Sequence, residues 1–128
     1  MTAVATQAFF RIEELPVKEI LAGVRLRSVN LDKLMVTFVE YKAGSTVPPH
    51  FHPYEQITCV LEGCLQVIIG ETQRILGPGE GVRIPPNVEH SSRPVHGAAK
   101  ALDAWTPVPE SFRVALDSAA ESAVALKG

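Results

Sequence analysis

Short segments in which apolar, often β-branched residues alternate with polar ones recur about every eight to twelve residues along this chain. Turn-forming residues separate these segments, for example Asn30-Leu-Asp-Lys, Gly70-Glu71 and Gly77-Pro-Gly79. The intervals leave no room for the helices of βαβ crossovers, so the pattern predicts an all-β sandwich or barrel. The expected strands cover residues 24–29, 34–41, 56–61, 64–69, 72–76, 81–84, 90–93 and 98–105.

A single domain accounts for the length of the chain. With 128 residues and 46% hydrophobic composition, it is long enough to bury one core of ordinary size. We expect residues 1–112 to form one barrel that includes the N-terminal arm. Residues 113–128, which are rich in alanine, are expected to be a C-terminal tail that is either a short helix or disordered.

The charge pattern favours a small-molecule partner. A formal net charge of -2, with both signs scattered, gives no electrostatic footprint for nucleic acid or an anionic membrane. No apolar run reaches the roughly 18 residues of a membrane span, and the N-terminus lacks a basic segment ahead of an apolar one. We therefore predict a cytoplasmic protein that binds neither nucleic acid nor membrane.

Two tight turns are expected, at Glu62-Gly63 and Gly70-Glu71, so that residues 56–76 would form a meander. Across the first turn, Cys59 and Cys64 would be diagonal neighbours about 7 to 8 Å apart. That separation is too long for an unstrained disulfide, so both cysteines are expected to be buried, reduced thiols. They would lie on the face opposite Gln56, which argues against a role as metal ligands.

Both faces of this meander are apolar, which predicts that something covers its outer side. Ile57, Leu61 and Ile68 would point away from the face that carries Gln56. The N-terminal arm or a second subunit could cover them. A homodimer is the more economical hypothesis, because closed two-fold pairs are the commonest oligomers.

The histidines predict a metal site. Three of the four lie in two short stretches, His50-Phe-His52-Pro-Tyr-Glu-Gln56 and Pro85-Pro-Asn-Val-Glu-His90. In extended chain, alternate side chains share a face, so His50, His52 and Gln56 would point together while Glu55 points away. A bulge at Pro53-Tyr54 would instead bring Glu55 inward, and that alternative stays open.

Three imidazoles and one amide would be four neutral ligands, leaving the charge of the cation available to polarise a carbonyl or acidify water. Such nitrogen and oxygen donors suit a divalent transition metal but do not distinguish Ni, Fe, Mn, Zn, Co and Cu. The fourth histidine, His96, precedes Gly97 and is expected to lie in a loop outside the site.

Asp103 and Trp105 are the candidate catalytic residues. Asp103 stands among apolar neighbours, where a carboxylate must be paired or functional, and near a metal it could carry a proton. The alternative is an ion pair with Arg or Lys at the barrel mouth. Trp105 could stack on a substrate or simply fill the core.

The same stretches resemble the two signatures of the cupin superfamily. The first signature is matched by Gly44, His50, His52, Gln56 and Gly63, and the second by Gly79, Pro85 and His90, with Asn87 in place of a glycine and Pro94 in place of an asparagine. The resemblance implies a double-stranded β-helix, or jelly-roll barrel, with a metal inside.

A closer likeness is to small single-domain cupins of the pectin-degradation type, which convert unsaturated monouronates to linear keto forms. In that group an aspartate of the last strand and an aromatic residue two positions on are thought to act on the substrate, which implies these roles for Asp103 and Trp105. An arginine commonly follows. This chain has Pro109 near that place, and Arg113 is the nearest substitute.

Together these features favour an enzyme, an isomerase or a lyase-like protein, that uses a metal and Asp103 to rearrange a small keto or uronic acid. An iron-dependent dioxygenase is the alternative enzyme, and a non-catalytic cupin that binds a small molecule or metal is the alternative of another class.

Overall fold

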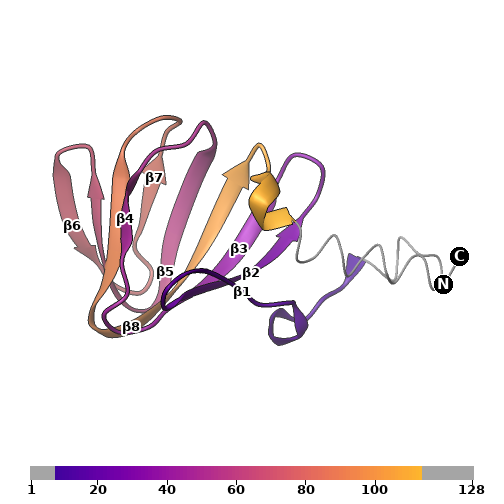
Figure 1. Cartoon of the computed structure of the whole chain (residues 1–128), viewed down its shortest axis with the longest axis horizontal. Coiled ribbons are helices and arrows are strands. Elements are labelled where there is room, and N and C mark those ends of the chain that lie inside the picture. Colours follow the sequence, from indigo (N-terminus) through magenta and orange to yellow (C-terminus); the bar gives the residue numbers. More distant parts are fainter. Residues whose placement is uncertain (1–7, 114–128) are drawn as a thin grey trace, which may run out of the picture.

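The computed structural model describes residues 8–113, which form antiparallel strands rolled into a barrel (Figure 1). This confirms the predicted all-β, double-stranded β-helix fold. In the described residues, helical conformation is confined to Ala8, a 3-10 turn at Ile12–Glu14 and residues 110–113, and the rest of the predicted tail lies outside the described range. Within the described range no helix is long and apolar enough to span a membrane. The strands are β1 (Lys18–Leu21), β2 (Val24–Asn30), β3 (Met35–Tyr41), β4 (Val47–His50), β5 (Glu55–Ile69), β6 (Thr72–Leu76), β7 (Gly81–Ile84) and β8 (His90–Thr106).

Two long strands, β5 and β8, hold the barrel together. They pair with each other from Glu55 opposite Thr106 to Ile69 opposite His90. The C-terminal half of β8 continues the sheet into β3, β2 and β1, while the N-terminal half of β5 pairs with β7. Their other halves pair with β4 and β6. Each long strand therefore belongs to both walls of the barrel.

The predicted hairpin at Glu62-Gly63 is wrong. The chain passes straight through these residues, and the register with β8 shifts there instead. Gly63 has a φ of 74°, and a Cβ at this position would overlap the carbonyl oxygen of Ala98. A glycine with positive φ serves a bulge or close strand contact as well as a turn, so the same residue fits both readings.

The prediction of two separate strands at residues 90–93 and 98–105 is also wrong. Residues 90–93 and 98–105 belong to one strand, β8, which bends at His96 and Gly97 with φ values of 64° and 123°. His96 is thus a strand residue, although its side chain is exposed as expected. By contrast, the turn at Gly70-Glu71 is confirmed, since Ile69 pairs with Thr72 and Gly70 has a φ of 58°.

The inner face of the larger wall consists of four rows of side chains that cross β2, β3, β8 and β5. Each row is named after its β8 residue. The Trp105 row contains Met35, Trp105 and Gln56; the Asp103 row Ser28, Thr37, Asp103 and Thr58; the Ala101 row Leu26, Val39, Ala101 and Val60; and the Ala99 row Val24, Tyr41 and Ala99. All of these residues are buried, so polar rows occupy one end of the barrel and apolar rows the other.

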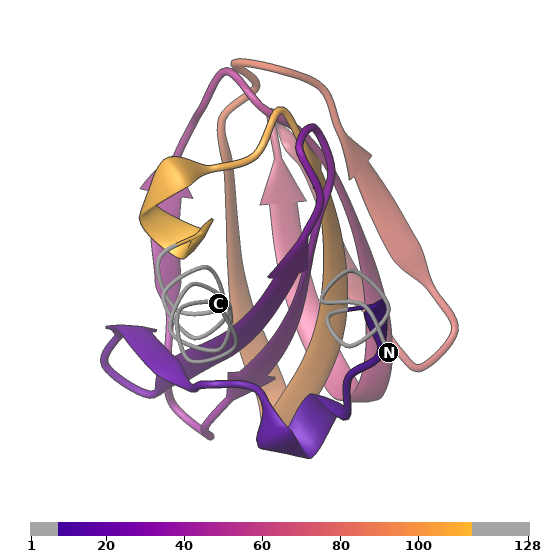
Figure 2. The same cartoon turned by 90° about the vertical axis from the view of Figure 1, so that its right-hand side faces the viewer.

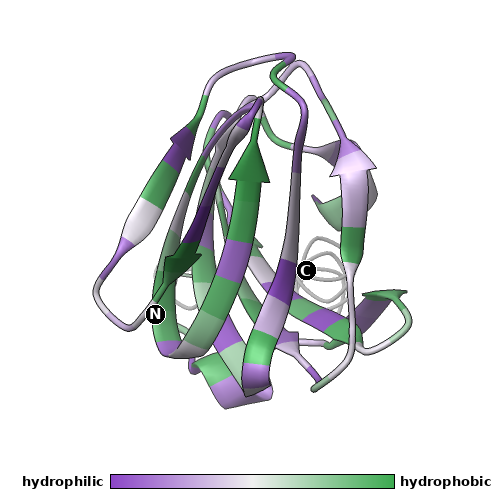
Figure 3. Cartoon of the chain, turned by 90° about the vertical axis from the view of Figure 1, so that its left-hand side faces the viewer, coloured by the Kyte–Doolittle hydropathy of each residue, from purple (hydrophilic) through white to green (hydrophobic). Residues whose placement is uncertain are grey.

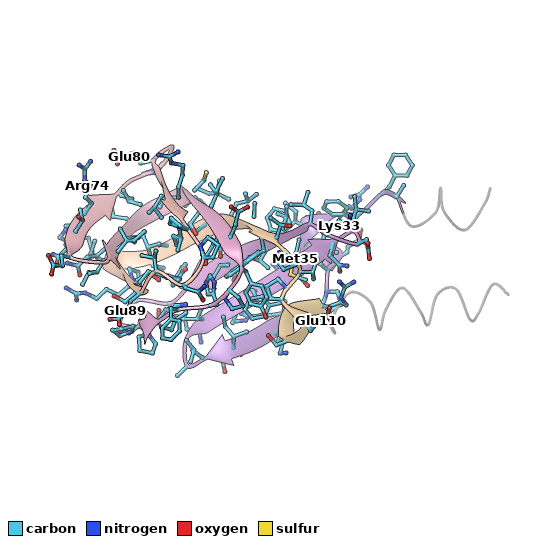
Figure 4. All side chains as sticks on the ribbon, turned by 90° about the horizontal axis from the view of Figure 1, so that it is seen from above. Lys33, Met35, Arg74, Glu80, Glu89 and Glu110 are labelled. Carbon is cyan, nitrogen blue, oxygen red and sulfur yellow. The ribbon has the colours of Figure 1, made fainter. Side chains whose placement is uncertain are left out.

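A small cluster closes the polar end. Trp105 packs with Met35 and Val108, and Phe112 covers them from the helical turn at 110–113. Ser28 Oγ donates to the carbonyl oxygen of Phe112 at 2.9 Å, which fixes the turn to β2. Figure 2 shows this helical turn, in yellow, in front of the strands, and Figure 4 places Lys33, Met35 and Glu110 on the opposite side of the molecule from Arg74 and Glu80.

The outer side of β5 and β6 is apolar and uncovered in the described chain. Ile57 and Leu61 are exposed on the part of β5 in the larger wall, and Ile68 and Ile75 on β5 and β6 in the other wall. Figure 3 shows the apolar and polar residues of the strands alternating along the chain. The predicted division of β5 into two faces is therefore confirmed. The predicted burial of the thiols is wrong, because Cys59 is exposed on this outer face and Cys64 is half-buried; both are free.

Candidate metal centre

Three histidines meet at the polar end of the barrel. His50 ends β4 and pairs directly with His90, the first residue of β8, and His52 follows two residues after His50. One ring nitrogen from each histidine lies within 4.8 Å of the others. The ring centroid of His90 is 4.2 Å from that of His50 and 4.9 Å from that of His52. The structure thus brings together the three histidines that the sequence selected.

Backbone carbonyls fix the tautomer of each ring. Nδ1 of His50 lies 2.8 Å from the carbonyl oxygen of Pro48, and Nδ1 of His90 lies 2.8 Å from that of Val88. Nδ1 of His52 lies 3.1 Å from the carbonyl oxygen of Tyr54. A carbonyl only accepts hydrogen bonds, so each Nδ1 is the donor and each neutral ring presents an Nε2 lone pair to the cluster.

The side-chain atoms that face the cluster are acceptors that receive no hydrogen bond. Nε2 of His90 is buried and has no partner. Nε2 of His52 lies 3.0 Å from Oε1 of Gln56, where two acceptors face each other. Two metal bonds of about 2.1 Å at a right angle place their ligand atoms about 3 Å apart. The donor set therefore fits a divalent cation held by His50, His52, His90 and Gln56.

Burial lowers the pKa of His90, and the neighbouring His50 and His52 lower it further, against a raising effect of the hydrogen bond to Val88. The environment of His90 thus favours its neutral form, which a metal ligand requires.

Gln56, and not Glu55, faces the histidines. The Glu55 side chain is exposed on the outer face, as strand parity predicts, so no bulge at Pro53-Tyr54 brings it inward. Gln56 Nε2 donates to Thr58 Oγ1 at 2.9 Å, which leaves Oε1 directed at His52. Thr58 was not among the predicted site residues, although its position two residues after Gln56 puts it on the same face.

Asp103 lies in the next row, linked to Gln56 through Thr58. Thr58 Oγ1 donates to Asp103 Oδ1 at 2.6 Å, and Thr37 Oγ1 lies 3.3 Å from Asp103 Oδ2. Asp103 is only 5% exposed, and this burial raises its pKa to about 6, although hydrogen bonds from Thr58, Thr37 and Gln56 act in the opposite direction. Hydroxyl groups take the place of the Arg or Lys partner that the alternative reading required.

Trp105 is both packed and directed at the site. Its Nε1 donates to Thr37 Oγ1 at 2.9 Å, so the hydroxyl of Thr37 joins Trp105 to Asp103. The indole centroid lies 5.3 Å from the His52 ring and 5.5 Å from the Phe112 ring. Trp105 therefore contributes to the end cluster and to the wall of the site.

A cavity of about 90 Å³ runs from this site into the barrel. His50, Gln56, His90, Asp103 and Trp105 line its polar end. Arg113 is not among its lining residues; its Nε pairs with Glu110 Oε2 at 2.9 Å. Arg113, the nearest substitute for that arginine in the sequence, thus pairs with Glu110 and lies outside the cavity wall.

Deeper in the cavity lies Tyr41, which was not among the predicted site residues. Burial and the charge of Asp103 raise the pKa of its hydroxyl, which is hydrogen-bonded to the Ser92 side chain. Nothing in the local sequence separates this residue from an ordinary strand tyrosine.

A rolled antiparallel sheet with a histidine cluster inside one end defines the class of the protein. The family model described as a cupin domain matches residues 37–105, more than half of the chain, which belongs to the cupin family.

The chain is 26% identical to the pectin degradation protein KdgF of Dickeya dadantii over 106 residues, covering 81% of this chain and 96% of that protein. Two solved structures share the fold. KdgF from Halomonas sp. has a TM-score of 0.77 at 23% identity, with 82% of this chain and 97% of the other covered. An RmlC-like cupin from Shewanella frigidimarina also has a TM-score of 0.77 at 23% identity, with 82% and 95% covered.

Proposed function

We propose that this cupin is a metal-dependent enzyme that moves a proton within a small keto or uronic acid. One observation carries the proposal: the buried carboxylate of Asp103 lines the same cavity as His50, His90 and Gln56. A proton carrier thus stands one row from a cluster of neutral donor atoms, an arrangement suited to acid–base chemistry beside a cation.

The ligands proposed for the cation are His50, His52, Gln56 and His90. When bound there, a divalent metal would polarise a carbonyl oxygen, which acidifies the hydrogen on the neighbouring carbon. Because all four ligands are neutral, none of them offsets the charge of the cation.

The chain's own residues would handle the proton. Asp103 would take it from the carbon next to the carbonyl onto Oδ1 or Oδ2 and return it to another atom of the same substrate. Thr58 and Thr37 hold the carboxylate in place through their hydroxyls, and Trp105 Nε1 in turn donates to Thr37. The raised pKa of Asp103 supports this role, since a group that titrates near neutral pH exchanges protons in both directions.

The relationship to a pectin degradation protein supports an acid derived from a sugar as one substrate class. The absence of Arg113 from the cavity wall sets this chain apart from the group that the resemblance identifies. The proposal is therefore stated for keto and uronic acids together.

Solvent exchange tests the function directly. Protein loaded with Zn²⁺ should incorporate deuterium from D2O into the carbon next to the carbonyl of an accepted keto or uronic acid, followed by NMR. Asp103→Asn should slow this exchange by at least about 100-fold, in the range of a lost general base. The exposed Glu55→Gln is the matched control and should exchange at the wild-type rate. Equal rates in Asp103→Asn and wild type would contradict the role of Asp103, and oxygen uptake by Fe(II)-loaded protein would indicate the dioxygenase alternative.

We also propose that two copies pair through the exposed apolar residues of β5 and β6. Ile57 and Leu61 are exposed on the part of β5 in the larger wall, and Ile68 and Ile75 on β5 and β6 in the other wall, where a second copy would remove them from water. Ile57→Glu and Ile75→Lys should then shift the mass measured by light scattering from dimer to monomer. A monomeric wild-type protein would contradict the pairing. The cytoplasmic location stays a prediction from the sequence.

A further inference from the structure

The cavity changes character along its length. Its metal end is polar, with contributions from the Trp105 and Asp103 rows. Beyond Asp103 the lining is hydrocarbon, because Leu26 and Val39 of the Ala101 row and Val24 of the Ala99 row come next. Successive rows are about 6.6 Å apart, two residues along a strand. A ligand that extends past Asp103 therefore meets an apolar wall.

The opposite wall is mostly apolar as well, with Val47, Leu65, Val67 and Val82. Its polar residues are Ser91 and Ser92, and the Ser92 side chain is already hydrogen-bonded to Tyr41. No arginine or lysine is among the described residues that line the cavity, and Asp103 is its carboxylate. If a ligand carried a second carboxylate away from the metal, that group would be repelled by Asp103 and would have no arginine or lysine to pair with.

The polar groups of the inner rows are already engaged. The Thr58 hydroxyl accepts from Gln56 and donates to Asp103, and the Thr37 hydroxyl accepts from Trp105 and faces Asp103. Tyr41, the polar group of the Ala99 row, is hydrogen-bonded to Ser92. A sugar acid carries a hydroxyl on nearly every carbon, and each one left without a partner in such a site weakens binding.

From this gradient we infer that the site takes a small 2-oxo acid with a hydrocarbon tail in preference to a sugar acid. This inference rests on the proposed function and deepens it. The adjacent carboxylate and carbonyl oxygens would lie at the His50, His52, His90 and Gln56 end, beside Asp103. The tail would extend past Asp103 onto Leu26 and Val39. The ligand carboxylate would then need no arginine, because a cation held by these four residues would bind it.

Calorimetry on the full-length, Zn²⁺-loaded protein tests the preference with three probes. We expect 4-methyl-2-oxopentanoate to bind at least tenfold more tightly than galacturonate, which has hydroxyls in place of a tail. It should also bind at least tenfold more tightly than pyruvate, which has the same oxygens and almost no tail. Galacturonate or pyruvate binding as tightly as the branched acid, or no binding by the branched acid, would overturn the inference.

A paired substitution locates the tail. Val39→Thr keeps the shape of a cavity-lining residue and adds a hydroxyl, so it should weaken binding of 4-methyl-2-oxopentanoate severalfold and leave pyruvate unchanged. Val36→Thr, on the outer face of the same strand, is the control and should change neither. Equal loss for both acids, or no loss in Val39→Thr, would overturn the assigned position. Should Val39→Thr not fold, the three-probe comparison in wild type still decides.

Deuterium exchange separates this inference from the proposed function. If galacturonate binds best and exchanges through Asp103, the substrate inference is wrong and the function stands. If the branched acid binds with the expected preference but Asp103→Asn does not slow its exchange, the function is wrong and the binding preference stands.

Discussion

Oε1 of Gln56 lies 3.0 Å from Nε2 of His52, and in the neutral His52 tautomer that donates from Nδ1 neither atom has a proton to offer the other. The ring proton of His52 is on Nδ1, which donates to Tyr54, and the amide protons of Gln56 face Thr58. Two lone pairs held this close repel each other unless a cation lies between them. The pair is thus arranged for a metal before any metal binds.

Metal binding should stabilise the fold through this cluster. At a free Zn²⁺ concentration of 100 times Kd, we expect a gain of about 2.7 kcal/mol in the free energy of unfolding, seen as a higher Tm in calorimetry. His52→Ala should abolish the gain, because it removes a ligand atom from the cluster. Glu55→Ala should keep it, since that side chain is outside the barrel. An equal gain in His52→Ala would rule out the assigned site.

Thr58 should control the metal affinity without touching the metal. Thr58→Val removes the hydroxyl that orients the Gln56 amide, so Zn²⁺ should bind about 10- to 100-fold more weakly in competition with a chromogenic chelator. Thr58→Ser restores the hydroxyl and should restore most of the affinity. If the serine variant binds as weakly as the valine variant, lost packing and not orientation is responsible.

Asp103 should make the stability of the metal-free protein depend on pH. Its pKa rises from 3.8 in the unfolded chain to about 6 in the fold, so the folded protein holds a proton that the unfolded chain has lost. The stabilisation that this proton gives is complete below about pH 3.8 and is lost as the pH rises through 6, a change of about 3 kcal/mol.

Urea unfolding of wild type and Asp103→Asn, in chelator between about pH 4 and pH 7, measures this change. The asparagine cannot ionise, so the variant should gain stability relative to wild type as the pH rises. Every other titratable group is common to the two proteins. A difference that stays constant across this range would contradict the raised pKa.

Gly63 should be far less replaceable than a glycine of similar backbone conformation elsewhere. Gly63→Ala adds a Cβ against the Ala98 carbonyl at a φ of 74° and should cost more than about 1 kcal/mol. Gly44, with a φ of 82°, has open space where its Cβ would lie, so Gly44→Ala measures the backbone cost alone. Similar losses of stability in urea unfolding would show that the contact with β8 contributes nothing.

Strand parity made much of this molecule predictable. A period of two residues assigned Gln56 inward and Glu55 outward, and it divided β5 correctly into its two faces on both sides of Gly63. The histidine spacing was equally informative, since a two-residue interval in extended chain places His50 and His52 on one side.

Long-range pairing was not predictable in the same way. Gly63 and Gly97 have the backbone conformation of turns, and only the partner strand shows that they are bends within β5 and β8. Thr37 and Tyr41 reach the site because β3 lies beside β8, a relationship between residues more than fifty positions apart that no local pattern records.

Glu55 and Gln56 lie side by side in the chain and on opposite faces of β5. The carboxylate of Glu55 thus lies one residue from the Gln56 amide but points away from the metal ligands. Deleting one residue between Gln56 and the Val60 core contact would exchange them and turn a neutral ligand set into an anionic one. In this barrel the register of β5 decides which of the two side chains points at the metal, and so decides the charge of the ligand set. Insertions and deletions in β5, and not only substitutions, could therefore change the chemistry of the site.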